Sequence, residues 1–212
     1  MVSVRPLPAS DLASRRLEAD DLPWATTLLM QAVADHPALR YVCADATGPA
    51  ARWLLSQLLA LTLRYGSAYT NADNTALALW LGSSQTAFRR GMLLSRVPAA
   101  WHLGWGSYQR LRRLLRTTSW LRGQQSGGLH HLLLAVVVHP SARGAGAGRR
   151  LLHTTLAVRQ ASRLPCYFSC QVPEQLAFYQ RQGFALTGHC AVGEGPAGQL
   201  TTWALLRPAP AP

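Results

Sequence analysis

The stretch that decides the fold, Leu129 to Leu152, has the sequence LHHLLLAVVVHPSARGAGAGRRLL. Its apolar run at 132–138 predicts a buried β-strand that ends at His139-Pro140. Glycine then alternates with other residues up to Gly148, and a helical pattern begins at once. Glycine lets a ligand approach the main chain, and consecutive N–H groups ahead of a helix N-terminus attract anions. The segment therefore predicts a strand, a pyrophosphate-binding loop and a helix.

Three phosphate-binding motifs can be tested against this loop. A P-loop needs a lysine, and the chain contains none. A dinucleotide fingerprint that starts at Gly144 would have an arginine at its third glycine position, and residues 168–170 lack the carboxylate expected there. The third pattern, Arg/Gln-x-x-Gly-x-Gly/Ala directly after a strand, fits Arg143, Gly146 and Gly148. The sequence favours this third pattern.

This loop resembles that of the GNAT superfamily, the acyl-CoA-dependent N-acetyltransferases. A second segment, 172–184, contains Phe178-Tyr179 and Gly183-Phe184 and is similar to the family's Phe-Tyr-x-x-x-Gly-Phe signature. Looser similarities lie at 14–33 and at 76–81, and the latter looks like a strand common in small bacterial members. The resemblance covers most of the chain from 14 to 207. Two motifs in the right order and spacing make it fairly specific.

The resemblance implies an α/β (α+β) fold of GNAT type. Its centre would be a mixed, mostly antiparallel, twisted sheet of about six to seven strands flanked by helices, with a helical insert before the central strand. The length of 212 residues favours one domain, residues 1–212. Within it we expect an N-terminal arm at 1–13, the helical insert at 88–122 and a disordered tail at 208–212.

Apolar periodicity, prolines and glycines predict the other elements. We expect strands at 15–17, 129–138 and 165–170, helices at 23–34, 49–65, 146–162 and 173–182, and hairpins that join 67–70 to 75–81 and 184–192 to 199–206. The insert should be helical, broken at Pro98 and at Gly104 or Gly106, and Trp120 should lie on its buried face. It could cover the acceptor pocket.

The resemblance also implies acetyl-CoA as the acyl donor, with no metal. The strand before the loop would pair with the pantetheine arm through its backbone, and the loop would hold the pyrophosphate. The cofactor-binding residues implied in this way are Val136, Val137, Val138, Arg143, Gly144, Ala145, Gly146, Ala147, Gly148 and Arg149.

Two catalytic residues are predicted. Tyr179 matches the tyrosine that protonates the departing thiolate in many relatives, although it could also be an ordinary half-buried aromatic residue. Many relatives carry a basic glutamate on the central strand, and the 129–138 run has none. His130 and His131 are the nearest titratable groups, and His131 is the candidate base because the pKa of histidine suits proton abstraction. A water chain to solvent could replace it.

These features predict transfer of the acetyl group to a primary amine of a small molecule or protein, by direct attack in a ternary complex. The alternative is a non-catalytic acyl-CoA sensor with the same fold. The sequence leaves the acceptor open, although the tryptophans of the insert hint at an aromatic amine. The oligomeric state is open too, and a homodimer is the commonest assembly.

Composition restricts the partners. All 21 basic residues are arginine, and the net charge of +12 attracts anions. Aromatic and arginine residues at 110–122 could bind nucleic acid, but an ordinary amphipathic helix explains them better. The apolar runs are too short to span a bilayer, and residues 1–10 lack a signal core. We therefore expect a cytoplasmic protein with no nucleic acid or membrane partner. Cys166 and Cys170 should be small buried hydrophobic residues.

Overall fold

The computed structural model describes residues 14–82, 96–195 and 198–210. It contains a seven-stranded sheet in the order β1-β2-β3-β4-β5-β7-β6, and every neighbouring pair is antiparallel except β4–β5. The strands are β1 (Ser14–Arg16), β2 (Gly66–Asn71), β3 (Ala76–Leu81), β4 (His131–Val138), β5 (Cys166–Cys170), β6 (Ala185–Gly195) and β7 (Gly198–Arg207). The predicted fold class is confirmed.

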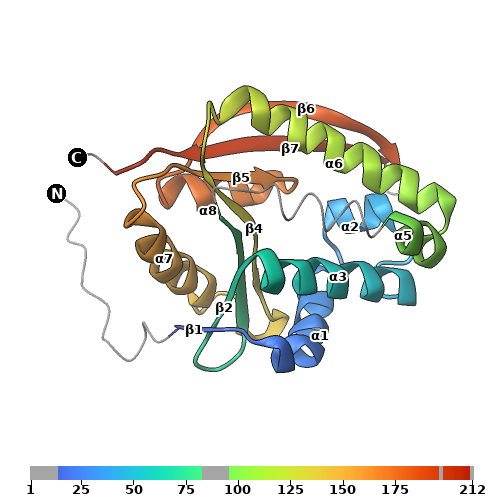
Figure 1. Cartoon of the computed structure of the whole chain (residues 1–212), viewed down its shortest axis with the longest axis horizontal. Coiled ribbons are helices and arrows are strands. Elements are labelled where there is room, and N and C mark those ends of the chain that lie inside the picture. The colour runs from blue at the N-terminus through green and yellow to red at the C-terminus, as the bar shows by residue number, and fades with distance from the viewer. Residues whose placement is uncertain (1–13, 83–95, 196–197, 211–212) are drawn as a thin grey trace.

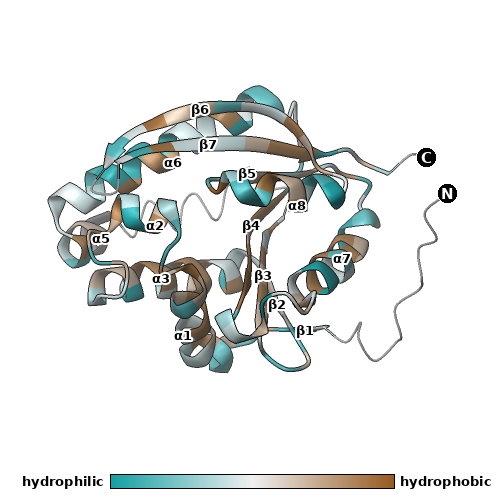
Figure 2. Ribbon diagram, turned by 180° about the vertical axis from the view of Figure 1, so that it is seen from behind, coloured by the Kyte–Doolittle hydropathy of each residue, from teal (hydrophilic) through white to brown (hydrophobic). Residues whose placement is uncertain are grey.

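Helices cover both faces of this sheet (Figure 1). They are α1 (Leu22–Val33), α2 (Pro37–Val42), α3 (Pro49–Tyr65), α5 (Arg96–Leu103), α6 (Trp105–Gln125), α7 (Ala147–Gln160) and α8 (Leu176–Arg181). One apolar cluster joins α1 and α3 to one face of β3 and β4, and another joins α7 and α8 to the opposite face. Figure 2 shows β3 and β4 as continuously hydrophobic, as expected for strands covered on both faces.

The sheet opens at β4. This strand pairs with β5 only over its first three residues, from His131 opposite Cys166 to Leu133 opposite Phe168. On its other edge β4 is paired with β3 from Leu132 to Val138, with one extra residue, Leu134, at a register shift. Such a bulge bends a strand and increases its twist. From Leu134 onward none of the described strands pairs with β4 on the β5 side, and the two halves of the sheet run in different directions in Figure 1.

The insert differs in detail from its prediction. Gly104 separates α5 from α6, as expected, but Pro98 lies in the first turn of α5 and Gly106 lies inside α6. Proline fits a first helical turn because those N–H groups have no intrahelical acceptor. Trp120 is 60% exposed, so its predicted place on a buried face is wrong. The part of the insert at 88–95, the arm at 1–13 and the end of the tail at 211–212 lie outside the described residues.

Candidate active site

The glycine loop follows β4 directly and leads into α7. A short 3-10 helix, Pro140–Ala142, turns the chain, and Gly144 and Gly146 then adopt φ angles of 83° and 78°. Only glycine takes this left-handed conformation without strain. Gly146 is the N-cap of α7, so the loop delivers its backbone to the start of that helix. The predicted strand, loop and helix are therefore present in this order.

Unpaired amides collect at this helix start. The first backbone hydrogen bond of α7 runs from Arg150 N to Gly146 O at 3.0 Å. The amides of Ala147, Gly148 and Arg149 come before it and have no acceptor one turn earlier in the helix. Together with the helix dipole they attract negative charge, so this end of α7 fits a diphosphate.

Gly148 sets the distance between this helix and β4. A β-carbon on Gly148 would lie 2.9 Å from Val138 Cγ2, closer than packed carbon atoms approach, and 3.7 Å from Val136 Cγ1, an ordinary contact. Glycine at this position therefore lets the helix start lie against the open half of the strand. The two parts of the predicted cofactor site, strand and loop, are held together by this contact.

The arginines of the loop have separate roles. Arg143 donates from Nη2 to the backbone carbonyl of Ala32 near the end of α1, at 2.8 Å. Arg150, which the sequence analysis did not select, donates from Nη1 to Ala145 O at 2.8 Å and so closes the loop on itself. Arg149 is exposed. Arg143 thus ties α1 to the loop in this structure, whereas Arg149 is available to an anion.

Tyr179 lies on α8 in an aromatic cluster. Its ring centroid is 4.2 Å from that of Phe168, 5.0 Å from that of Phe178 and 6.0 Å from that of Phe184. The side chain is buried, and burial raises the pKa of its phenol well above the ordinary value. The phenol therefore stays protonated at neutral pH. It can donate a proton or a hydrogen bond but cannot act as a base.

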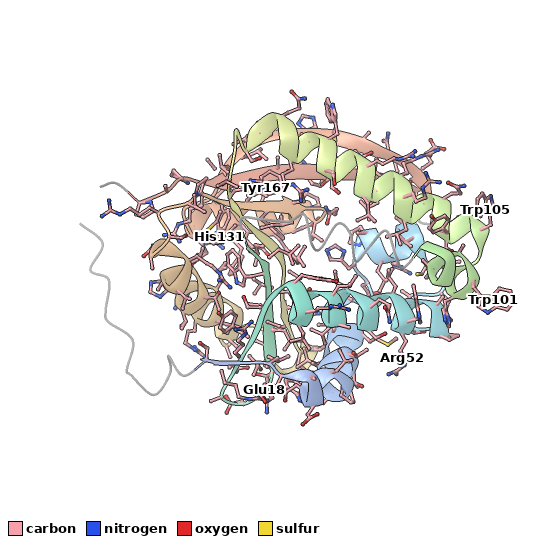
Figure 3. All side chains as sticks on the ribbon, viewed as in Figure 1. Glu18, Arg52, Trp101, Trp105, His131 and Tyr167 are labelled. Atoms are coloured by element: carbon pink, nitrogen blue, oxygen red, sulfur yellow. The ribbon has the colours of Figure 1, made fainter. Side chains whose placement is uncertain are left out.

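His131 lies at the other end of β4 from the loop. Seven residue steps along a strand span about 23 Å. Its Nε2 is 2.6 Å from Ser162 Oγ, and Ser162 Oγ donates to Arg159 O at 2.8 Å, so Nε2 carries the histidine proton. Burial, with a smaller effect of Arg159, lowers the pKa of His131. Figure 3 shows the residue labelled beside the closed end of β4. The structure does not bring it to the loop, and we leave it out of the proposed reaction.

The side of the opening formed by β5, β7 and α2 was not predicted from the sequence. β5 ends opposite Trp203 of β7, and β7 continues beyond it to Gly198 with only β6 as its partner. The chain from α1 to α2 bridges the gap, because Ala32 contacts the loop through Arg143 and α2 contacts β6 and β7. Tyr41 of α2 belongs to the buried cluster that also contains Val137 of β4. Pro37 after His36 was the one available signal for α2.

Cys166 and Cys170 are buried on β5, as predicted. Among residues 14–82, 96–195 and 198–210, no group of three His, Cys, Asp or Glu side chains could hold a metal ion. In the same part of the chain, no helix is both long enough and apolar enough to cross a membrane.

Comparison with known proteins agrees with this architecture. The model of the acetyltransferase (GNAT) domain family matches residues 113–186, which include β4, the loop, α7 and α8. A solved structure described as histone acetyltransferase HPA2 and related acetyltransferase from Corynebacterium glutamicum covers 94% of this chain and 97% of its own, with 20% identity and a TM-score of 0.61.

Two insect enzymes have the same fold. Arylalkylamine N-acetyltransferase 2 from Aedes aegypti is 13% identical, with a TM-score of 0.68 over 93% of this chain and 99% of that one. The polyamine N-acetyltransferase of Drosophila melanogaster is 14% identical, with a TM-score of 0.66 over 92% and 98% of the two chains. At these identities the structures show the fold. The family-model match therefore covers the central strand, the loop and α7, and the rest of the chain shares the fold of these acetyltransferase structures.

Proposed function

We propose that this protein transfers the acetyl group of acetyl-CoA to a primary amine by direct attack within a ternary complex. The observation that carries the proposal is the pairing of β4. Its second half has a free edge, and that edge leads directly into a loop and helix start with unpaired amides. When bound, acetyl-CoA supplies a thioester whose carbonyl carbon the amine attacks, forming the C–N bond and breaking the C–S bond.

The chain would hold the donor mainly through its backbone. Alternate residues of an antiparallel strand direct their N–H and C=O groups to opposite edges. In the segment Val136, Val137 and Val138 some of these groups therefore face the open edge, where they can pair with the amides of a pantetheine arm. An N–H group there can also stabilise the developing negative charge on the carbonyl oxygen, a contribution of about 3 kcal/mol for one donor.

The loop would hold the diphosphate. Its donors are the backbone amides of 144–149, with the guanidinium of Arg149 alongside. The sequence between Asp73 and Glu174 contains no aspartate or glutamate. This stretch includes β4, the loop and α7, so none of them carries a carboxylate that would repel an anion. The residues present therefore suit a polyanionic nucleotide.

Tyr179 would protonate the leaving thiolate. Burial keeps its phenol neutral, so Oη carries a proton to share with the thiolate, and the same raised pKa favours a strong hydrogen bond over complete proton transfer. The amine proton would leave through water to solvent, because His131 lies at the closed end of the strand. Primary amines are the proposed acceptors, and the activities named for the two insect structures support this class.

Two measurements test this proposal. Isothermal titration should show saturable binding of acetyl-CoA to the full chain, and a thiol-release assay with a broad amine panel should show turnover. Binding without release of thiol for any amine would favour the acyl-CoA sensor. Absence of acetyl-CoA binding would refute both functions.

A further inference from the structure

The junction of α2, α6 and β6 contains a positively charged corner on the acceptor side of the opening. The corner consists of Tyr41, Arg113 and Gly193. Arg113 Nη1 lies 3.0 Å, and Tyr41 Oη 3.7 Å, from the point that a β-carbon on Gly193 would occupy. Gly193 has a φ of 133°, a conformation that residues with side chains avoid, and the register of β6 against β7 shifts next to it. The backbone thus leaves room there for the guanidinium.

Tyr41 has an unused hydroxyl. The side chain is 1% exposed, and its Oη has no hydrogen-bond partner among the described residues. Buried hydroxyl groups nearly always have a partner, so an exception in a site suggests that a ligand supplies one. The solvent-exposed side chain of Arg113 lies next to this hydroxyl and can move. An anion bound by the guanidinium could then accept a hydrogen bond from the phenol.

Arg113 forms no ion pair among the described residues, although Glu194 follows Gly193 in the chain. The two ion pairs of the described residues are Arg15–Asp21 and Arg40–Asp35. The neighbouring Arg110 donates to Val42 O at 3.2 Å and 3.0 Å and adds a second positive charge at the end of α2.

A buried apolar cluster connects the corner to the open half of β4. Tyr41, Val192 of β6 and Leu200 of β7 share one continuous buried cluster with Val137, which lies in the open half of β4. The bridge from α1 to α2 begins at the loop and ends at Tyr41. A ligand group held by Arg113 would therefore belong to the acceptor, on the opposite side of the opening from the diphosphate loop.

We infer that the acceptor amine carries an anionic group, a carboxylate or a phosphate, which Arg113 and Tyr41 bind. This inference depends on the proposed function and specifies its substrate class. A cationic acceptor such as a polyamine would meet the like charge of Arg113 and Arg110 at this corner, neither of which forms an ion pair among the described residues. The tryptophans do not favour an aromatic amine, because Trp101 and Trp105 are 88% and 67% exposed and point outward at the end of the α5–α6 pair in Figure 3.

Matched pairs of amines test this inference. We expect wild-type kcat/KM to be at least about 10-fold higher for tyrosine than for tyramine, or for phosphoethanolamine than for ethanolamine, because a charge-assisted bond is lost in the second member. The first pair reports a carboxylate site and the second a phosphate site. Arg113→Gln should abolish the preference mainly through KM, Tyr41→Phe should reduce it, and the matched control Arg116→Gln, on the exposed side of the same helix, should retain it.

A second measurement does not depend on turnover. With CoA present, titration should show N-acetyltyrosine binding about 10-fold more tightly than N-acetyltyramine, or N-acetylphosphoethanolamine more tightly than N-acetylethanolamine, with the difference absent in Arg113→Gln. Equal binding within both pairs, or a wild-type preference for the uncharged-tail or polyamine substrates, would overturn the inference and leave the acetyltransferase proposal intact. Failure of acetyl-CoA itself to bind would instead refute the proposed function.

Discussion

The two halves of β4 differ in what lies beside them. The first half, from His131 to Leu133, has β3 on one edge and β5 on the other, and it ends in a buried polar contact with Ser162. The second half, after Leu134, has β3 alone, and it leads into a glycine loop. The first half joins the two parts of the sheet by pairing with β5, and the second half presents an unpaired backbone edge. We therefore expect the first half of β4 to contribute to the stability of the fold and the second half to contribute to ligand binding.

This difference explains why the proposed donor site consists mainly of backbone groups. A free strand edge and a helix start recognise a ligand through N–H and C=O groups that every residue carries. Side chains there mainly set distances, as Gly148 does against Val138. The proposed acceptor corner is the opposite case, because Tyr41, Arg113 and Gly193 come from three elements distant in the sequence and would act through their particular chemistry.

The largest loss of acetyl-CoA affinity is expected when a side chain fills the contact between the second half of β4 and the start of α7. Gly148→Val places carbon atoms against Val138 Cγ2, which forces α7 away from β4. Acetyl-CoA affinity, measured by titration, should fall more than about 100-fold because strand and loop no longer act together. Gly128→Ala is the matched control, since its β-carbon would meet nothing within 4 Å. Unchanged affinity in Gly148→Val would show that the two parts do not form one site.

Removal of the proposed acid should be the next largest effect. Tyr179→Phe retains the ring among Phe168, Phe178 and Phe184 and removes only the hydroxyl. We expect kcat to fall about 10- to 100-fold, with acetyl-CoA binding unchanged, because proton donation acts on the chemical step. Steady-state kinetics and titration on the same variant measure both quantities. A normal kcat would assign Tyr179 to packing alone.

The closed half should affect stability rather than chemistry. Burial lowers the pKa of folded His131 below its unfolded value near 6.5, so the unfolded chain takes up a proton first as pH falls. His131 therefore costs no stability from this source above pH 6.5 and progressively lowers stability below it. Thermal unfolding of His131→Gln should depend less on pH in that range than unfolding of the wild type. Its pH–rate profile should match the wild type, and loss of the low-pH limb, which a general base produces as it is protonated, would restore His131 as the base.

The smallest effect is expected for Arg143. Its guanidinium bonds Ala32 O, so Arg143→Gln should loosen α1 from the loop and weaken acetyl-CoA binding only about 3- to 10-fold. Arg149→Gln, which removes an exposed charge near the helix start, is the comparison, and its loss should increase at low salt. A collapse of binding in Arg143→Gln alone would mean that its side chain contacts the nucleotide directly.

The strand, the glycine loop and the helix ends were predicted well because each depends on residues close together in the sequence. The run before His139, the alternating glycines and the aromatic pair before Gly183 each determine structure within a few residues. The order and approximate bounds of the described strands and helices followed from the same kind of signal. The exceptions are α2, which was not predicted, and the details of the helical insert. These short helical segments depend on tertiary contacts, which periodicity does not report.

Long-range features were not predictable in the same way. No local pattern indicates that pairing with β5 stops at Leu133, since the apolar run continues unbroken to Val138. His131 was selected for its pKa class, and its distance from the loop became visible only with the sheet register. The meeting of Tyr41 with Arg113 depends on how α2 and α6 pack against β6.

Amide hydrogen–deuterium exchange with and without acetyl-CoA tests the central claim most directly, because it separates the two halves of β4 in one experiment. Peptides covering the open half and loop, residues 134–149, should become protected when acetyl-CoA binds. Peptides covering 129–133 should exchange equally in both states, since β3 and β5 already pair with that half. Protection confined to 129–133, or no change at 134–149 under saturating acetyl-CoA, would contradict the account.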